Sequence, residues 1–466
     1  MHPRLTADLE RLPELLEAAS RHAAAFLDGL DGRPVVPTAQ APAAAPPARG
    51  VGLSAALREF AERWEPGLSA GAGPRYLGFV TGGVTPAALA GDWLTSAVDQ
   101  NPMSSLDPAG QRLEQEAIGW LRDLFGLSDG HEGNFVSGAT MSNTVGLAVA
   151  REWLGERRGV SPADEGAAVL GPVRVLSGSP HSSVAKGLSM LGLGRSALVP
   201  VATLPGREAV DPAALERALR EADSPCVVVA NAGTVNTVDF DDIRAIAALR
   251  ERYGFWLHVD AAFGAFAALS PAHAHLVDDI DEADSLCVDL HKWLNVPYDS
   301  AVQFTRRRDL QARVFQNAAA YLGPLGDAPE AVHLTPENSR RLRALAAWFT
   351  LRAYGRDGYR EIVERCVACA RTVGAAVDAH PGLRLLAPVR LNVVCFTLAE
   401  DATAGRLAAL ARELADTAFL TPTVYAGEPA LRAAFSNWRT TVDDTERVIK
   451  ALADAVDSTR GGAPAA

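Results

Sequence analysis

Lysine is scarce in this sequence. It occurs only at Lys186, Lys292 and Lys450 in a chain of 466 residues, and arginine supplies the other basic side chains apart from histidine. The formal net charge of −12 argues against nucleic acid or an anionic membrane as a partner. In a chain that uses lysine so rarely, each lysine is a candidate for a specific chemical role.

Long apolar runs and cysteines are also few. No stretch approaches the roughly 18 consecutive apolar residues that span a bilayer, so no membrane segment is expected. The first twenty residues are charged throughout, without an apolar signal core, which predicts a protein that is not exported. The five cysteines favour a reducing compartment, the cytoplasm. Cys366 and Cys369 form a C-x-x-C within an amphipathic helical pattern, and we interpret them as buried helix residues.

The chain divides by composition into several parts. Its first 30 residues predict one or two helices, residues 31–50 are rich in proline and alanine and predict an extended linker, and a helical pattern resumes over 51–64. The expected units are an N-terminal helical arm, a large domain, a smaller C-terminal α/β domain and a disordered tail, over residues 1–75, 76–340, 341–460 and 461–466.

Short apolar runs alternate with helical patterns in the middle of the chain. The runs are rich in valine and do not alternate with polar residues, which is typical of parallel strands covered on both faces. We therefore predict an α/β fold with a mostly parallel sheet, whose ligand would bind beyond the carboxyl ends of the strands. The expected strands lie within residues 173–178, 225–233, 255–262, 284–292 and 300–306.

Two charged residues stand at the ends of expected strands. Lys292 lies in VDLHKW (288–293), and an amine that forms a Schiff base must be partly desolvated so that it can lose its proton. Asp260 lies in the apolar LHVDAAF (257–263), and a buried carboxylate requires a partner such as a protonated pyridine nitrogen. A lysine reaching solvent and a carboxylate capping a loop are the alternatives.

Two further segments contain small and polar residues at helix starts. In NFVSGATMSNTVGL (134–147), Ser137, Gly138, Ala139 and Thr140 precede or begin an expected helix, whose free N–H groups suit a phosphate. An ordinary Ser or Thr N-cap is the alternative. In SPHSSVAKG (179–187), His181 could stack on a planar cofactor, or it could be a solvent-exposed loop residue.

In this order, SGAT, PHSSVAKG, HVDAAF and HKW resemble the group II pyridoxal-phosphate decarboxylases, the family of aromatic-amino-acid and glutamate decarboxylases. Similar segments extend the resemblance over roughly residues 10–455: RYLGFVTGGVTPAALAGDWLTSAVDQN, SRRLRALAAWFTLRAYG and NWRTT (75–101, 339–355 and 437–441). The resemblance implies a fold-type I enzyme with a seven-stranded sheet, a homodimer with shared active sites. It also implies that the enzyme converts an L-amino acid to the amine and CO₂.

The same resemblance implies roles for individual residues. Lys292 forms the internal aldimine with pyridoxal 5′-phosphate, Asp260 pairs with the pyridine nitrogen, and His181 stacks on the ring and assists proton transfer. Phosphate would be held by Ala139 and Thr140 with His291 beside it. The other residues expected in the site are Ser137, Gly138 and Thr234 for the cofactor, and Phe79 and Thr81 for the substrate.

The sequence departs from the family pattern at two places. Asp289 stands where aromatic-type members carry an Asn within reach of the phosphate, and a carboxylate there would be repelled unless it is protonated or turned away. The mobile-loop Tyr that protonates the product carbanion has no clear counterpart, and only Tyr321 and His333 lie nearby. In relatives, loss of that Tyr accompanies oxygen-consuming formation of an aldehyde.

Several alternatives therefore stay open. The cofactor could support oxidative deamination or aldol cleavage, an aminotransferase could use Arg439 to grip a carboxylate, and a desulfurase would need a loop cysteine. A non-catalytic protein of this fold would not require both Lys292 and Asp260. Tyr76 and Phe79 near the expected entrance favour an aromatic or apolar amino acid as substrate.

Overall fold

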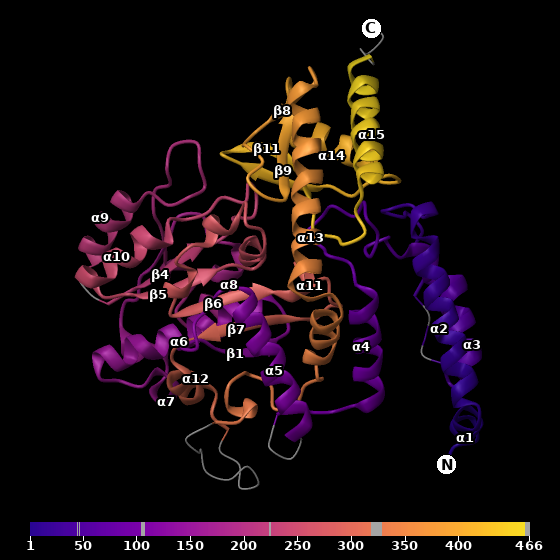
Figure 1. Cartoon of the computed structure of the whole chain (residues 1–466), viewed down its shortest axis with the longest axis horizontal. Helices are drawn as coiled ribbons and strands as arrows, with labels where there is room; N and C mark the ends of the chain where they lie inside the picture. The colour runs from indigo at the N-terminus through magenta and orange to yellow at the C-terminus, as the bar shows by residue number, and fades with distance from the viewer. Residues whose placement is uncertain (44, 46, 104–107, 223–224, 318–328, 462–466) are drawn as a thin grey trace.

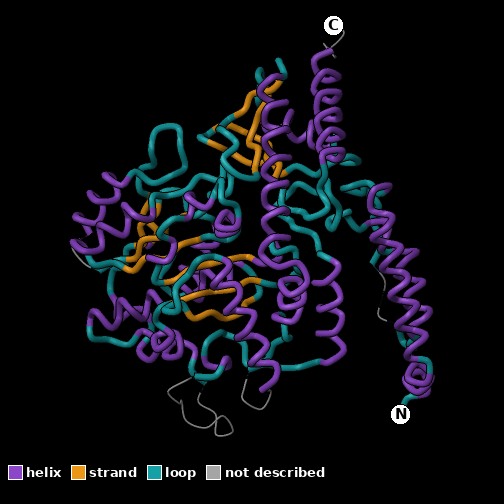
Figure 2. Tube along the Cα trace, viewed as in Figure 1, coloured by secondary structure: helices purple, strands orange, loops and turns teal. Residues whose placement is uncertain are grey.

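The structure is a computed structural model that describes residues 1–461 except 44, 46, 104–107, 223–224 and 318–328. Its helices and strands follow one another along the chain as an N-terminal helical arm, a large sheet with its helices, and a small sheet with two long helices (Figures 1 and 2). The helices are α1 (Pro3–Glu10), α2 (Leu12–Asp28), α3 (Leu53–Arg63), α4 (Pro86–Val98), α5 (Pro108–Leu124), α6 (Ala139–Arg158), α7 (Pro162–Glu165), α8 (Ser182–Met190), α9 (Pro212–Ala222), α10 (Ile243–Tyr253), α11 (Leu290–Trp293), α12 (Arg308–Phe315), α13 (Ala344–Ala379), α14 (Ala404–Glu413) and α15 (Val442–Gly461).

Two sheets organise the molecule. The large one has seven strands in the order β1-β7-β6-β5-β4-β2-β3, and all neighbours are parallel except that β7 runs antiparallel to both β1 and β6. The small one is antiparallel, in the order β10-β11-β9-β8. The strands are β1 (Glu132–Val136), β2 (Val175–Ser177), β3 (Leu198–Pro200), β4 (Val227–Asn231), β5 (Trp256–Asp260), β6 (Ser285–Asp289), β7 (Ala301–Thr305), β8 (Leu383–Leu385), β9 (Val393–Leu398), β10 (Thr421–Tyr425) and β11 (Glu428–Ala434).

The large sheet is covered on both faces, which explains its continuous apolar strands. Val227 and Val229 of β4 pack into one cluster with residues of α6 and α8. Val228 and Ala230, which point the other way, join the main core with residues of α5 and α13. The predicted mostly parallel sheet with helices on both faces is therefore confirmed, and five of its seven strands fall within the expected runs.

The long helix α13 connects the two sheets. Its helical geometry is interrupted at Gly355, whose φ of 59° is left-handed. Glycine adopts this conformation without a Cβ clash, so the chain can change direction inside a nearly continuous helix. The C-terminal half carries Cys366 and Cys369 on its buried side, as the interpretation of the C-x-x-C expected.

The N-terminal arm lies apart from the body of the molecule. Helices α2 and α3 lie side by side with α1 at the end of this pair, and the N-terminus lies at one end of the molecule and the C-terminus at the opposite end (Figure 1). The expected linker, residues 31–50, contains a short 3-10 turn and otherwise no regular element where it is described. Most of the expected tail, residues 462–466, lies outside the described residues, and the domain boundaries at 75, 340 and 460 stay predictions.

Two kinds of feature are absent from the part of the chain that the structure describes. No helix there is long and apolar enough to cross a membrane. Within the same residues, no group of three or more His, Cys, Asp or Glu side chains could hold a metal ion. Polar side chains that could bind a small molecule gather instead at one edge of the large sheet.

Candidate active site

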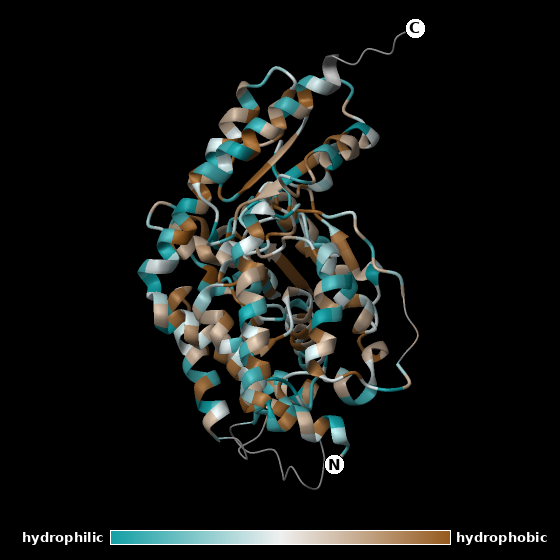
Figure 3. Cartoon of the chain, turned by 90° about the vertical axis from the view of Figure 1, so that its right-hand side faces the viewer, coloured by the Kyte–Doolittle hydropathy of each residue, from teal (hydrophilic) through white to brown (hydrophobic). Residues whose placement is uncertain are grey.

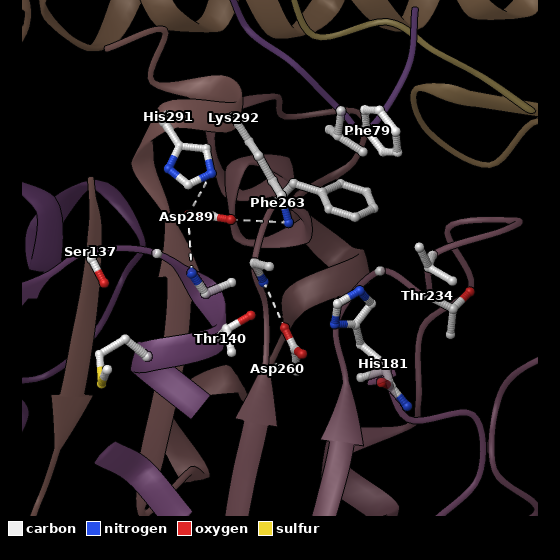
Figure 4. A pocket seen from close by; sticks show the side chains of 18 of the residues that line it. Phe79, Ser137, Thr140, His181, Thr234, Asp260, Phe263, Asp289, His291 and Lys292 are labelled. Carbon is white, nitrogen blue, oxygen red and sulfur yellow. Dashed lines mark hydrogen bonds and ion pairs between the residues drawn. The ribbon is translucent and has the colours of Figure 1, made fainter. Parts of the chain in front are cut away.

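Three neighbouring parallel strands end in polar residues at one edge of the large sheet. These residues are Asn231 of β4, Asp260 of β5 and Asp289 of β6. A cavity of about 440 Å³ lies there, within the size range of small-molecule sites (Figure 4). Its lining comprises Phe79, Val80, Ser137, Gly138, Ala139, Thr140, Met141, His181, Asn231, Gly233, Thr234, Val235, Asp260, Ala262, Phe263, Asp289, His291, Lys292 and Arg432.

Lys292 lies in the short helix α11, which follows β6 without a loop. Its Nζ lies 3.2 Å from Asp289 Oδ2 and 5.5 Å from the centre of the Phe263 ring. Burial acts to lower the pKa of Lys292, but the carboxylates of Asp289 and Asp260 together hold it above its ordinary value. The sequence argument expected an amine poised to lose its proton, whereas in the described structure the side chain is an ammonium held by an ion pair.

Asp289 is the centre of a set of contacts that join β6, α6 and α11. Its Oδ1 accepts the Ala139 N–H at 3.2 Å and lies 3.2 Å from His291 Nε2. Burial acts to raise the pKa of Asp289, but the charge of Lys292 and the contact with His291 hold it below its usual range. The carboxylate that the sequence marked as a departure is thus ionised and points into the cavity (Figure 4).

Asp260 is held by two hydrogen bonds. Asn143 Nδ2 donates to Asp260 Oδ2 at 2.8 Å, and the Ala262 N–H donates to Oδ1 at 3.2 Å. Asp260 is buried, and it lines the cavity. A carboxylate oxygen accepts more than one hydrogen bond, so Asp260 can still accept a hydrogen bond from a donor in the cavity.

A buried network behind Asp260 fixes its orientation. Because Asp260 only accepts, Asn143 must present its amide to it, and Asn143 Oδ1 then accepts from His258 Nε2 at 2.9 Å. His258 Nδ1 in turn lies 2.8 Å from the Ser285 hydroxyl, which accepts from Trp256 Nε1. Every group in this chain has a partner when His258 is neutral. Burial lowers the pKa of His258 to about 4, in agreement with that state.

His181 joins the same network from the start of α8. The second hydrogen of the Asn143 amide goes to Ser183 Oγ at 2.9 Å, so the Ser183 hydroxyl donates to His181 Nδ1 at 2.8 Å. The ring is exposed to the cavity, yet the protein around it lowers its pKa, chiefly by desolvation. Its Nε2–H then faces away from the network, and the ring presents a flat surface to a ligand (Figure 4).

The segment before α6 supplies no side-chain cap of its own, and the Ala139 N–H donates instead to Asp289 of β6. Gly138 is the N-cap residue, and no side chain bonds to the first N–H groups from that position. The ordinary Ser or Thr cap considered for this segment is therefore excluded. Ser137, Gly138, Ala139 and Thr140 all line the cavity, so the N-terminal end of α6, which favours anions, opens into it.

The loop over the cavity is strained. Phe79 and Val80 both adopt left-handed φ angles, 56° and 60°, which are unusual for a bulky residue and for a β-branched one. Contacts on both sides impose this shape: Leu77 bonds to Phe419 beside the small sheet, and Thr85 bonds to Asn295 beyond α11. Such strain persists where the surrounding structure fixes it, often at functional sites.

The structure brings together all but one of the residues that the sequence proposed for cofactor and substrate. Thr81 lies instead in an adjoining cavity, which shares Phe79 and His291 with the first. Thr234 lines the main cavity, but its hydroxyl donates to Glu208 at 2.6 Å. The lining of the second cavity comprises Ser69, Gly71, Ala72, Tyr76, Phe79, Thr81, Gly83, Val84, His291, Val296 and Tyr298.

Other residues considered at the sequence level lie elsewhere. Arg439 lies over Trp438 and lines a cavity near α15, away from Lys292. His333 is buried and accepts the Asn317 N–H, and it lines neither cavity of the site. Tyr321 lies outside the described residues.

The residues at or behind the cavity that sequence reasoning missed include four with polar, aromatic or charged side chains: Asn143, Asn231, Phe263 and Arg432. Arg432 comes from β11 of the small sheet, is 5% exposed, and donates to the Val235 carbonyl. Its Nε has no hydrogen-bond partner among the described residues. The LHVDAAF segment contained a signal for Phe263, but nothing in the sequence connected β11 with the carboxyl edge of the large sheet.

With this geometry in view, comparison with known proteins identifies the class. Residues 40–399 match the model of the pyridoxal-dependent decarboxylase conserved domain, so the chain belongs to that family. It is 28% identical over 407 residues to an aromatic-L-amino-acid decarboxylase of Bacillus atrophaeus, covering 82% of each chain. It is 30% identical over 425 residues to an L-2,4-diaminobutyrate decarboxylase of Rhizobium meliloti, covering 88% of this chain and 83% of the relative.

Solved structures agree in fold. A crystal structure of Oryza sativa TDC with PLP and tryptamine superposes with a TM-score of 0.88 at 22% identity, covering 97% of this chain and 98% of that one. Rhodiola rosea 4-hydroxyphenylacetaldehyde synthase superposes with a TM-score of 0.85 at 21% identity, covering 97% and 99%. The protein is an enzyme of the pyridoxal-phosphate-dependent amino-acid decarboxylase family.

Proposed function

We propose that this enzyme removes the carboxylate of an L-amino acid as CO₂ and releases the amine, with pyridoxal 5′-phosphate attached to Lys292. One observation carries the proposal: Lys292, Asp260 and His181, from three separate elements, converge on one cavity together with the N-terminal end of α6. An amine, a carboxylate, a flat ring and an anion-binding helix end are the groups that this cofactor requires.

The residues present fit the cofactor. Ser137, Gly138, Ala139 and Thr140 would hold its phosphate, His181 would stack on its ring, and Asp260 would keep its pyridine nitrogen protonated. When bound, the cofactor supplies an electron sink for the bond that breaks. The network through Asn143 holds Asp260 and His181 in position before any ligand arrives, so little reorganisation is needed on binding.

The apolar lining supports removal of a carboxylate. Phe79, Val80 and Phe263 form part of the wall near Lys292. An apolar wall excludes water and disfavours a charged carboxylate relative to neutral CO₂. Arg432, whose Nε lacks a partner among the described residues, would orient the amino acid by its α-carboxylate.

The adjoining cavity suggests the class of side chain. Tyr76, Phe79, Val84, Val296 and Tyr298 line it, and it has few charged groups. We propose that it receives an aromatic or apolar side chain, which agrees with the expectation from Tyr76 and Phe79. Relatives that act on acidic or basic amino acids are equally similar in sequence, so a charged substrate is the alternative to test.

A second reaction outcome has specific support. Among the described residues, the tyrosines that line the two cavities are Tyr76 and Tyr298, and Tyr298 Oη lies 3.3 Å from the Thr81 hydroxyl. Neither comes from the loop that supplies the protonating Tyr in amine-forming relatives. Oxygen-dependent formation of an aldehyde is therefore the second candidate, and a protein named as an aldehyde synthase has the same fold.

Incubation of the cofactor-supplied enzyme with carboxyl-labelled amino acids tests both candidates. We expect labelled CO₂ together with one equivalent of amine from an aromatic or apolar amino acid. Labelled CO₂ with an aldehyde, ammonia and hydrogen peroxide would replace the first candidate by the second. Spectroscopically loaded enzyme that releases no label from any amino acid would contradict both.

We also propose that the active form is a homodimer of the cytoplasm. Exposed apolar side chains run along the arm and α4, including Leu9, Leu16, Trp64, Trp93 and Val98. Apolar and polar residues alternate over the arm helices in the side view (Figure 3). A second copy of the chain is the occupant that the family resemblance favours. All five cysteines are free and buried, which suits a reducing compartment.

A further inference from the structure

Asp289 already binds two of the groups that the cofactor needs. Its Oδ1 accepts the first N–H of α6, from Ala139, and its Oδ2 lies 3.2 Å from the ammonium of Lys292. In the proposed site the phosphate requires that N–H, and the cofactor's carbonyl carbon requires that amine. The carboxylate is 3% exposed and its strand is paired on both sides, so it stays beside the phosphate position.

The negative charge of Asp289 has a neighbouring positive charge only while Lys292 is an ammonium. The titratable groups that face it are His291 and Lys292 from α11, Asp260 from β5, Cys287 within β6 and His181 from α8. Burial raises the pKa of the Cys287 thiol well above its ordinary value, so it carries no charge. Two carboxylates thus share the ammonium of Lys292, with Arg432 as the other cation in the described lining of the cavity, and a phosphate would add negative charge to this group.

We infer that binding of the cofactor's phosphate is coupled to the uptake of one proton from solvent by Asp289, whose neutral carboxylic acid then donates its O–H to a phosphate oxygen. An ionised carboxylate only accepts hydrogen bonds and would repel the phosphate, whereas the acid form presents a donor, as an amide does. Once Lys292 is joined to the cofactor, it no longer offers Asp289 a free ammonium, which favours the acid form further.

His291 is a poorer place for this proton. The Ser300 N–H donates to His291 Nδ1 at 3.4 Å, so Nε2 carries the hydrogen that faces Asp289 Oδ1. A second proton on the ring would go to Nδ1, where it would face the Ser300 N–H and remove that hydrogen bond. Protonation of Asp289 removes no donor and relieves the repulsion directly.

The test compares two ligands and two proteins, and it rests on the proposed cofactor site. Dissociation constants of pyridoxal 5′-phosphate and of pyridoxal, which lacks the phosphate, are measured by absorbance titration between about pH 6.5 and 8.5 for the native enzyme and for Asp289→Asn. Titrations of the ring and of Lys292 are shared by the two ligands. The ratio of the two dissociation constants therefore isolates the effect of the phosphate.

We expect the native enzyme to lose affinity for pyridoxal 5′-phosphate relative to pyridoxal as pH rises. For each pH unit, this relative loss should exceed that of Asp289→Asn by up to about tenfold. Asp284→Asn is the matched control, because it removes a carboxylate just before the other end of β6, and it should behave as the native enzyme. Equal pH dependence of the ratio in native enzyme and Asp289→Asn would overturn the inference.

A second measurement needs no variant. Calorimetry of 4′-deoxypyridoxine 5′-phosphate in buffers of different ionisation enthalpy gives the protons taken up on binding, and this ligand cannot react with Lys292. We expect about one proton more than for 4′-deoxypyridoxine after correction for the ligand's own phosphate titration. If no extra proton is taken up, the inference about Asp289 is wrong but the proposed cofactor site stands. If none of these ligands binds, the proposed cofactor site is wrong as well.

Discussion

Lys292 has a neighbour, Asp289, that keeps it charged until a ligand arrives. This pairing distinguishes the site from one in which burial alone would neutralise the amine. The proposed role of Lys292 as the attachment point therefore depends on groups that arrive with the cofactor and change the local charge.

Replacement of Lys292 by Ala should abolish turnover, by on the order of a thousandfold or more, because no other lysine is among the described residues that line the cavity. Bound cofactor should also lose the absorption of its covalent form. The fold should persist, since Asp289 keeps its hydrogen bond from Ala139. Circular dichroism and thermal unfolding check this point, and exposed Lys450→Ala is the control. Native-like turnover in Lys292→Ala would contradict the assignment.

His258 should make stability depend on pH in a defined window. Its pKa of about 4 in the folded chain lies below the ordinary 6.5, so between these values the unfolded chain binds a proton that the folded chain does not. The contribution of neutral His258 is fully present above about pH 6.5 and is lost as pH falls toward 4.

The variant His258→Asn should reveal this dependence by difference. The advantage of the native enzyme in free energy of unfolding should shrink by up to about 1.4 kcal/mol for each pH unit below 6.5. Denaturant titrations at several pH values measure it. Exposed His275→Asn is the control and should show no such trend. A constant difference from pH 5 to 8 would mean that His258 is not held neutral by its burial.

At the scale of secondary-structure elements, the site depends on close approach between the strained loop and α11. A Cβ on Gly82 would lie 1.7 Å from the Lys292 carbonyl oxygen and 2.9 Å from its carbonyl carbon. Both are backbone atoms of the helix that carries the amine, so neither can move aside as a flexible side chain would. Glycine at this position thus fixes the distance between the loop and Lys292.

We therefore expect Gly82→Ala to lower cofactor affinity at least tenfold and to destabilise the fold by about 2–4 kcal/mol, through overpacking against backbone. Gly119→Ala in α5 is the matched control, since a Cβ there meets nothing within 4 Å. The control should be neutral or stabilising by up to about 1 kcal/mol. Cofactor titration measures the affinity, and denaturant unfolding measures the stability, of each variant. Native-like values for Gly82→Ala would show that the loop can move to accommodate a Cβ.

At the scale of the whole molecule, the chain exposes more surface than a compact monomer does. Its accessible surface is 20,857 Å², whereas the usual scaling for a 49.1 kDa monomer gives roughly 17,000 Å². The excess agrees with an arm that lies apart from the body in Figure 1. Exposed apolar residues on that arm and on α4 are typical of a surface that is buried in a protein interface.

The double variant Leu9→Glu and Leu16→Glu should convert a dimer into a monomer, because both exposed leucines lie on the arm and charge there opposes burial. Light scattering coupled to size exclusion measures the mass. Val169→Glu, an exposed apolar residue away from the arm and α4, is the control and should stay dimeric. A native enzyme that runs as a monomer would contradict the proposed assembly.

Local features of this protein follow from its sequence alone. Valine-rich runs form strands because they bury on both faces, and Gly138 at the N-cap position of α6 has no side chain with which to cap it. Lys292 and Asp260 are identifiable because charge at the end of an apolar strand is costly without a partner. Each of these inferences needs only a few consecutive residues, so it does not depend on how distant parts of the chain pack.

Which distant groups meet is set by the tertiary structure. Asn143 and Asp260 are separated by 117 residues, and Arg432 reaches the cavity from a different sheet. The ammonium state of Lys292 follows from Asp289, whose effect depends on a 3.2 Å distance that composition does not specify. Electrostatic and hydrogen-bond energies depend on distance and burial, which arise only when the strands pair and the helices pack against them.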